Sequence, residues 1–346
     1  RNNYKVISAH EIEEKKLIDF YKIVYPHRLK SLINSWKWLN RSDYYNNSAP
    51  LIMIDQDGDI ISHFGMMPFK MVLDNEIYNA HWLIDFVVHP DYRRAGLGHI
   101  ITDKIMGFSD IQITCCNEKA IKIFIKLGMI TSDSSFYHLF FIKPFNHKKL
   151  RVYFPSFIRR IFNFMSNYIL SLLYEKRAFP KESIMVEELN DYNVKSFINS
   201  NMKGDLIATT DRNSSYLNWR LVKSPDKNAY RIFSSKSSNI RFIIKLSDKK
   251  KYNCINILMQ NEPVKDIDII RLISSLALWG NEHGYDYVDY YTSRNQRSKK
   301  IKSALYSSRK YNHFAFHSFD KEIFSKLKKA SFYFDYIDSD FEKYFE

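Results

Sequence analysis

The segment from Arg93 to Gly98 has the residue types and spacing of an anion-binding loop. A predicted strand (83–88) and a turn at Pro90 lead into the run Arg93-Arg94-Ala95-Gly96-Leu97-Gly98, and a predicted helix (96–108) begins inside that run. Backbone N–H groups at a helix N-terminus converge on one point, and the helix dipole adds to their field. Gly96 and Gly98 lack a Cβ, so a phosphate can approach the backbone closely. The sequence therefore predicts a phosphate site here.

Two common phosphate loops do not fit this segment. The chain contains no G-x-x-x-x-G-K-[ST] motif, which excludes a Walker loop. A dinucleotide fingerprint needs a third glycine at position 101, where this chain has Ile101. That fingerprint also needs parallel strands, whereas the strands predicted before the loop are joined by hairpins.

The R-x-x-G-x-G form, placed after a strand that ends in V-x-P, resembles the acetyl-CoA loop of the GCN5-related N-acetyltransferase (GNAT) superfamily. A second match lies downstream, in the family pattern N-x-x-A-x-x-x-[YF]-x-x-x-G-[FM]. The residues in register with that pattern are Asn117, Ala120, Phe124, Gly128 and Met129. The resemblance covers about residues 1–145 and implies an acyl-CoA-dependent N-acyltransferase, with acetyl-CoA as co-substrate and no metal.

The resemblance also implies which residues contact the cofactor. Backbone N–H groups from Arg94 to His99 would hold the pyrophosphate, the splayed strand end at 86–88 would pair with the pantetheine amides, and Asn117 would bond the cofactor arm. The full set of implied cofactor contacts is Phe86, Val87, Val88, Arg93, Arg94, Ala95, Gly96, Leu97, Gly98, His99, Asn117 and Phe124.

The catalytic residues are less clear, because the chain departs from the family pattern. Many members have a Tyr as general acid where this chain has Phe124, so Tyr137 or another hydroxyl replaces it, or the thiolate leaves unassisted. The strand at 111–115 lacks the carboxylate that many members use as a base. Asp85, within the apolar run 83–88, is therefore the candidate base, although it could instead only shape the cleft. His63 could pair with Asp85 or be a satisfied core residue.

The pattern of apolar residues predicts alternating helices and strands in both halves. In the first half we expect a helical segment at 12–34 that is broken at Pro26, helices at 96–108 and 118–127, and strands at 51–54, 60–67, 71–73, 78–88, 111–115 and 137–142. In the second half we expect helices at 187–199 and 267–283, and strands at 230–234, 240–246, 254–259 and 287–292. The element order repeats. The expected fold is α/β (α+β), with two GNAT-like domains, each a mixed, mostly antiparallel sheet flanked by helices.

Residues 148–179 differ from the rest, with an apolar helical stripe that begins among Lys148, Lys149, Arg151, Arg159 and Arg160. A basic amphipathic helix can lie on an anionic membrane. The alternative, which we adopt as the prediction, is a connector packed between two domains. The predicted domains are then 1–145 with the acetyl-CoA site, 146–180 as connector, and 181–346 as a degenerate domain for acceptor binding or structure.

The second half carries a pattern that resembles bacterial tandem-GNAT proteins of surface-polysaccharide biosynthesis. Its residues are Arg212, Tyr216, Leu217, Trp219, Arg220, Pro225 and Tyr230. This half lacks the glycine loop, so we expect one cofactor site per chain. Trp36, Tyr44, Trp219 and Arg220 suit the face of a sugar and a phosphate, which favours an amino sugar, free or nucleotide-linked, as acceptor. The alternatives are a peptide or protein amine, an aminoacyl-tRNA-dependent (Fem-like) transferase and a non-catalytic CoA-binding protein.

The composition of the chain excludes several classes of protein. The chain has 346 residues, 45% of them hydrophobic, three cysteines and a net charge of +14. It is therefore neither disordered nor a disulfide scaffold, and it is typical of a reducing, cytoplasmic setting. The positive charge favours a polyanionic partner or reflects only solvated lysines. We expect a small-molecule amine as partner, no stable nucleic-acid complex and at most weak electrostatic attraction to membranes. The oligomeric state is open.

Overall fold

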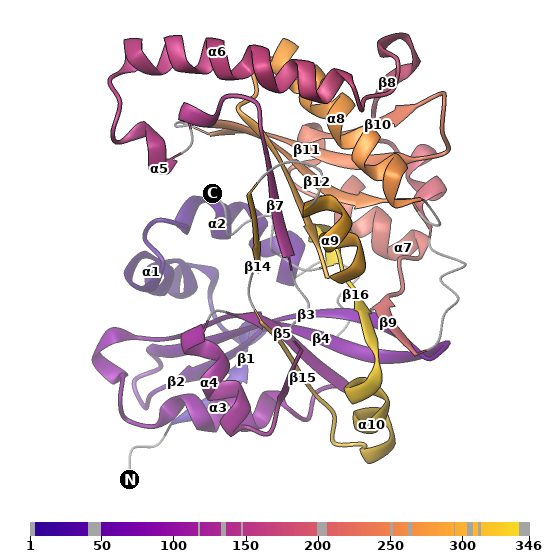
Figure 1. Ribbon diagram of the computed structural model, residues 1–346. Helices are drawn as coiled ribbons and strands as arrows, with labels where there is room; N and C mark the ends of the chain where they lie inside the picture. The colour runs from indigo at the N-terminus through magenta and orange to yellow at the C-terminus, as the bar shows by residue number, and fades with distance from the viewer. Residues whose placement is uncertain are drawn as a thin grey trace.

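The chain forms two sheets, one in the lower and one in the upper part of Figure 1. This computed structural model describes residues 4–40, 50–116, 118–132, 136–146, 148–198, 206–249, 252–261, 265–293, 295–302, 307–310 and 313–338. Helices flank both sheets, so the predicted α/β class is confirmed.

The first sheet is mostly antiparallel and has the strand order β1-β2-β3-β4-β5-β15-β6, with β9 pairing with β3 and β16 pairing with β9. Its strands are β1 (Lys5–Ser8), β2 (Leu51–Ile54), β3 (Ile60–Leu73), β4 (Glu76–Val88), β5 (Ile111–Cys116), β6 (Ile130–Ser132), β9 (Ile207–Thr210), β15 (His313–His317) and β16 (Ser331–Tyr333). The accompanying helices are α1 (Glu14–Val24), α2 (Leu29–Asn40), α3 (Leu97–Ile105), α4 (Glu118–Lys126) and α10 (Lys321–Lys329). Within this sheet β4 and β5 are parallel neighbours.

The second sheet has the order β14-β7-β13-β12-β11-β10-β8. Its strands are β7 (Phe136–Phe141), β8 (Ile184–Glu188), β10 (Tyr230–Ser235), β11 (Arg241–Lys249), β12 (Tyr252–Gln260), β13 (Tyr287–Thr292) and β14 (Ser307–Lys310). The remaining helices are α5 (Lys148–Arg151), α6 (Ser156–Glu175), α7 (Ser214–Leu217), α8 (Asp266–Glu282) and α9 (Asn295–Lys302).

The two sheets repeat one arrangement. In the first, β3 and β4 are antiparallel, and α3 crosses from β4 to its parallel neighbour β5. In the second, β11 and β12 are antiparallel, and α8 crosses from β12 to its parallel neighbour β13. The repeat of element order predicted from the sequence is therefore a structural repeat.

The two halves exchange strands. β7, from the first half of the chain, lies between β13 and β14 in the second sheet. β15, from the second half, lies between β5 and β6 in the first sheet. The domain limits at residues 145 and 180 stay a prediction. Each of the two sheets, however, contains strands from both sides of these limits.

One hydrophobic core joins the halves. Trp38 on α2 stacks on Trp219 with ring centroids 5.3 Å apart. The indole Nε1 of Trp38 donates to the carbonyl of Trp219 at 2.8 Å, and Nε1 of Trp219 donates to the carbonyl of Trp38 at 3.1 Å. Both rings are buried in a cluster that also contains Trp82 and Phe314. The halves therefore share a packed interface rather than a linker alone.

Several predicted elements have different limits in the structure. The predicted strands 60–67 and 71–73 form the single strand β3, since Pro68 pairs opposite His81 without ending the strand. The predicted break at Pro26 does separate two helices, α1 and α2, but α2 continues beyond residue 34 to Asn40. The predicted helix 187–199 is wrong: residues 184–188 are the edge strand β8, and 193–197 are a short 3-10 helix.

The prediction that residues 148–179 pack between two domains is also wrong. Figure 1 shows α6 along the outer edge of the second half, beside α8 and away from the first sheet. The side chains expected to be buried there include Phe157, Ile161, Met165 and Leu172, and all four are exposed. Helical periodicity identified an amphipathic helix, but it could not tell which face the rest of the protein covers.

Candidate active site

The loop between β4 and α3 has the geometry predicted for an anion site. Arg94 and Gly96 both adopt left-handed backbone conformations, with φ of 72° and 73°. Left-handed residues in a turn direct neighbouring N–H groups to one side, as in anion-binding nests. No acidic residue lies in the first turn of α3. The N-terminus of this helix is therefore open to an anion.

A pocket of 340 Å³ lies at this loop. Its lining residues are Phe86, Val88, Tyr92, Arg93, Arg94, Gly96, Leu97, Gly98, His99, Ile123 and Lys126. Gly98 packs closely against Phe86, because a Cβ there would lie 3.1 Å from Cζ of Phe86 and would displace the ring by a few tenths of an ångström. The lining contains eight of the twelve residues predicted to contact the cofactor. It also contains Lys126 from α4, a cation that the sequence motifs did not single out.

Strands β4 and β5 separate next to this pocket. Their parallel pairing runs from Ala80 to Trp82 on β4. Past that point the hydroxyl of Thr114 on β5 donates to the carbonyl of Leu83 at 3.0 Å. Residues 86–88 continue on β4 without a pairing to β5 among the described residues. Their backbone groups on that side can bind an extended ligand as an added strand would.

A β-bulge interrupts β4 at Asp85. Between the pairs His63–Val87 and Gly65–Ile84, two residues of β4 stand opposite the single residue Phe64 of β3. Asp85 takes a left-handed conformation with φ of 48°. A Cβ at Gly65 would lie 2.8 Å from the carbonyl oxygen of Ile84. The bulge thus depends on a glycine in the neighbouring strand, and it re-aims the Asp85 side chain.

Asp85 is the centre of a small polar cluster at the bulge. Arg28 donates from Nη1 to Oδ1 of Asp85 at 2.6 Å, and the Asp85 side chain is only 9% exposed. Nδ1 of His63 lies 3.0 Å from the carbonyl oxygen of Asp85, which can only accept, so His63 carries its proton on Nδ1. Nε2 then accepts from the hydroxyl of Tyr21 at 3.0 Å. The predicted pairing of His63 with Asp85 exists, but through the backbone.

Burial controls the charge of the two neutral members of this cluster. Burial lowers the pKa of His63, against the opposing field of Asp85. Burial also raises the pKa of Tyr21 well above its usual value, with the Asp85 charge adding to the effect. His63 is therefore a neutral support for the bulge at neutral pH, while Asp85 and Arg28 carry the charges.

Comparison with known proteins identifies the first half. Residues 5–110 match the acetyltransferase (GNAT) domain family. The matched region includes the bulged strand, the loop and α3. Residues 5–110 form a GNAT domain. The chain therefore contains the domain of a GNAT-type acyltransferase. No curated protein sequence matches it.

Solved structures show the same fold over nearly the whole chain. A GCN5-related N-acetyltransferase from Kribbella flavida aligns with a TM-score of 0.59 at 10% identity, over 92% of this chain and 72% of that chain. Saccharomyces cerevisiae N-myristoyltransferase with bound myristoyl-CoA aligns with a TM-score of 0.59 at 8% identity, over 92% and 79%. A putative acetyltransferase from Pyrococcus horikoshii aligns with a TM-score of 0.54 at 9% identity, over 97% and 96%.

The structure places the residues of the second GNAT motif, and the candidate acid Tyr137, in different surroundings. Phe124 on α4 is buried and packs edge-on against Phe64, so it belongs to the core beneath the pocket. Asn117 lies outside the described residues. The hydroxyl of Tyr137 donates to Oδ2 of Asp289 at 3.3 Å. Tyr137 lies on β7, so the strand exchange places this candidate acid in the second sheet.

The predicted acceptor residues of the second half have a structural role instead. Trp219 is buried against Trp38, as described above. Arg220 is also buried, with Nε donating to the carbonyl of Ile337 at 3.0 Å and its guanidinium over the Trp38 ring. Tyr44 and the side chain of Trp36 lie outside the described residues. An aromatic and basic pattern therefore marked the junction of the two halves, not an acceptor site.

The segment that leads into the crossover helix of the second half, residues 260–266, contains no glycine, unlike the anion loop of the first half. Its crossover helix α8 begins with Asp266 and Asp268 in the first turn. The Asp266 carboxylate accepts from Arg297 at 3.0 Å and from Lys300 at 2.8 Å. A carboxylate already occupies the positive end of this helix, so a phosphate there would be repelled. This difference favours the predicted single cofactor site per chain, which stays a prediction.

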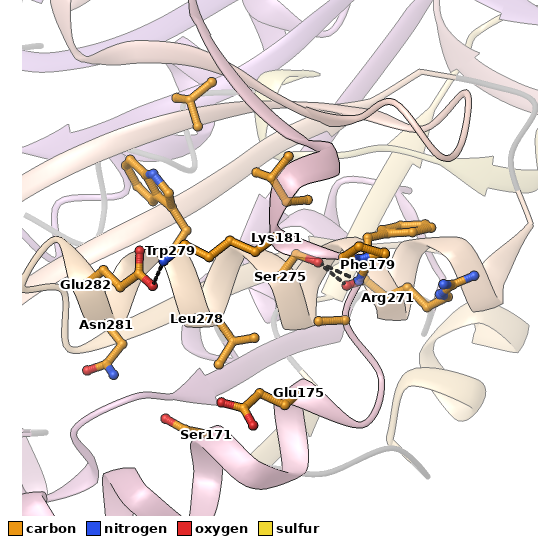
Figure 2. Close-up of a pocket in the computed structure, with 14 residues that line it drawn as sticks. Ser171, Glu175, Phe179, Lys181, Arg271, Ser275, Leu278, Trp279, Asn281 and Glu282 are labelled. Carbon is orange, nitrogen blue, oxygen red and sulfur yellow. Dashed lines mark hydrogen bonds and ion pairs between the residues drawn. The ribbon is translucent and has the colours of Figure 1, made fainter.

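Among the described residues, no group of His, Cys, Asp or Glu has the arrangement of a metal site. A larger pocket of 770 Å³ lies between α6 and α8. Figure 2 shows its lining, with Ser171 and Glu175 on α6 and Leu278 and Asn281 on α8. It shares no residue with the pocket at the GNAT loop, so it is not part of the candidate active site.

Proposed function

We propose that this protein transfers an acetyl group from acetyl-CoA to the amine of an amino sugar, free or nucleotide-linked, in surface-polysaccharide biosynthesis. The main support for acetyl-CoA as the acyl donor is the loop pocket beside the separated ends of β4 and β5. Arg93, Arg94 and Lys126 supply positive charge there, and Leu97 and Gly98, the first residues of α3, also line the pocket. This combination suits a pyrophosphate joined to an extended amide-bearing arm.

Bound acetyl-CoA supplies an activated acyl group. In the transfer, the acceptor nitrogen bonds to the thioester carbonyl carbon, the carbon–sulfur bond breaks, and the amine proton passes to a base. Asp85 fits that role because its Oδ1 is held by Arg28, which leaves Oδ2 for the incoming amine. Arg28 positions the carboxylate, and the bulge aims it away from the regular strand path.

An amino-sugar acceptor is supported by one structural neighbour, by the tandem arrangement and by the positive charge of the chain. A glucosamine N-acetyltransferase region of a fungal β-N-acetylglucosaminidase has the same fold, with a TM-score of 0.54 at 12% identity over 92% of this chain and 38% of that chain. The tandem arrangement and the positive charge also favour a phosphate-bearing sugar. A panel of amines assayed by release of free CoA thiol would separate amino sugars from peptides. Acetyl-CoA and myristoyl-CoA as donors would define the acyl length.

The loop is tested by substituting its glycine. Gly98→Asp places a carboxylate at the helix N-terminus and against Phe86, so binding of acetyl-CoA should become undetectable by calorimetry. Gly107→Asp is the matched control, because a Cβ at Gly107 has nothing within 4 Å. Unchanged affinity in Gly98→Asp would show that the loop does not hold the cofactor.

The base is tested by Asp85→Asn, which keeps the shape of the side chain but cannot accept the proton. We expect kcat to fall about 10²–10⁴-fold with little change in acetyl-CoA affinity. Asp91→Asn, an 82% exposed carboxylate on the same loop, is the control. Turnover within a few-fold of the unaltered protein would assign the proton to another group.

A further inference from the structure

The outward face of α6 is a continuous apolar surface. Its members, here called the outer stripe, are Phe157, Ile161, Phe164, Met165, Tyr168, Ile169 and Leu172, and each is more than 40% exposed. Phe164 and Tyr168, at its centre, are 79% and 66% exposed. The spacing of three and four residues places them on one side of the helix. Exposed apolar surface of this extent marks an interaction site.

The inward face of α6 is fixed by polar contacts. Asn163 accepts from the backbone N–H of Phe145 and donates to Asn146, both at 2.9 Å. Asn167 donates to Asn281 of α8 at 2.7 Å, and the hydroxyl of Tyr174 donates to the carbonyl of Phe141 at 2.9 Å. The asparagines that interrupt the apolar pattern in the sequence therefore face the protein. The orientation of the helix, with its outer stripe in solvent, is determined by these bonds.

A basic pocket lies beside the stripe at the first half of α6. It has a volume of 470 Å³ and is lined by Lys143, Asn146, Ser156, Arg159, Arg160, Asn163, Phe164 and Asn167. No carboxylate lines it, and no described carboxylate forms an ion pair with Arg159 or Arg160. The buried Nε of Arg159 has no hydrogen-bond partner among the described residues. Three cations and several amides here have the chemistry that binds a phosphate group.

The charge around the outer stripe distinguishes between two surfaces that could cover it, a second copy of the chain and a phospholipid membrane. Residues 148–177 contain seven lysines and arginines and one acidic residue, Glu175. A second copy of the chain would bring a like-charged face against this one, which is unfavourable. An anionic phospholipid surface would match both features, with phosphates for the cations and acyl chains for the stripe. None of the described helices is long and apolar enough to cross a membrane.

We infer that α6 docks this protein onto the surface of an anionic phospholipid membrane, with its outer stripe among the lipid chains and the basic pocket on a lipid phosphate. The helix lies in the plane of the interface and does not span it. At about 1.5 Å per residue, its 20 residues provide a contact about 30 Å long. This inference is independent of the acceptor and of the transfer reaction.

The test is co-sedimentation with vesicles of phosphatidylcholine alone and of phosphatidylcholine with phosphatidylglycerol, at 0.1 M and 1 M salt. We expect binding to the anionic vesicles that weakens in high salt but persists, since apolar insertion is not screened. Phe164→Glu with Tyr168→Glu should lower the partition coefficient roughly 100-fold, about tenfold for each aromatic side chain withdrawn from the lipid. Arg160→Glu should lower it roughly 20-fold at 0.1 M salt.

The matched control is Tyr192→Glu with Phe319→Glu, which replaces two equally exposed aromatic residues away from α6. It should bind vesicles like the unaltered protein. Binding that vanishes at 1 M salt, or that survives the α6 double substitution, would overturn the inference. So would sedimentation velocity showing a dimer that the α6 double variant converts to a monomer without any vesicle binding, because a second copy would then be the occupant.

Discussion

His81 makes the stability of this protein depend on pH in a way that its location predicts. The residue lies on β4, opposite Pro68 and Gln112, just before β4 and β5 separate. It is buried, and neither ring nitrogen has a hydrogen-bond partner among the described residues. Burial lowers the pKa of His81 to about 4. An unfolded chain would hold the same group at its ordinary pKa of about 6.5.

The direction of the effect follows from proton binding. Between pH 6.5 and pH 4 the unfolded chain binds a proton at His81 and the folded chain does not, so the free energy of unfolding falls as the pH falls. From pH 7.5 to pH 5.0 the loss from this residue is about 2 kcal/mol. Above about pH 7.5 the residue contributes almost no pH dependence.

The perturbation is His81→Leu, which removes the proton-binding group and keeps an apolar side chain in the strand. The assay is urea unfolding at pH 7.5 and pH 5.0. The unaltered protein should lose about 2 kcal/mol more than the variant between these two conditions, because other titrating groups cancel in the comparison. His10→Leu, at an exposed histidine, should leave the pH dependence unchanged. An equal loss in His81→Leu and the unaltered protein would refute a buried neutral histidine.

Two further predictions concern the core and the thiols. Trp219→Ala removes the stacked ring and the hydrogen bond from its Nε1 to the Trp38 carbonyl, and should cost about 3–5 kcal/mol in urea unfolding; a cost below about 1 kcal/mol would contradict the shared core. Burial raises the pKa of Cys116 to about 12. In a Cys115→Ser background, thiol labelling at pH 8 should therefore be about 1000-fold slower in the folded protein than in urea; rapid labelling of Cys116 would show an accessible thiolate.

The features that the sequence determined are local ones. The phosphate loop was predictable because two glycines and two arginines follow a strand and open a helix within six residues. The hairpin before it was predictable from turn residues such as Asp74 and Asn75, which do adopt positive φ. In both cases neighbouring residues impose the backbone geometry, so composition and order are sufficient. The repeated order of elements likewise anticipated two related sheets.

Only the tertiary structure showed which distant residues and strands contact one another. Arg28 reaches Asp85 across 57 residues of sequence, and Trp38 meets Trp219 across 181. The exchange of β7 and β15 depends on pairing between halves, which no local pattern encodes. The orientation of α6 also depends on contacts with residues that are distant in the sequence. Its apolar stripe was visible in the sequence, but only the bonds of Asn163 and Asn167 to the protein leave that stripe facing outward. A local pattern specifies a surface, and long-range packing determines what covers it.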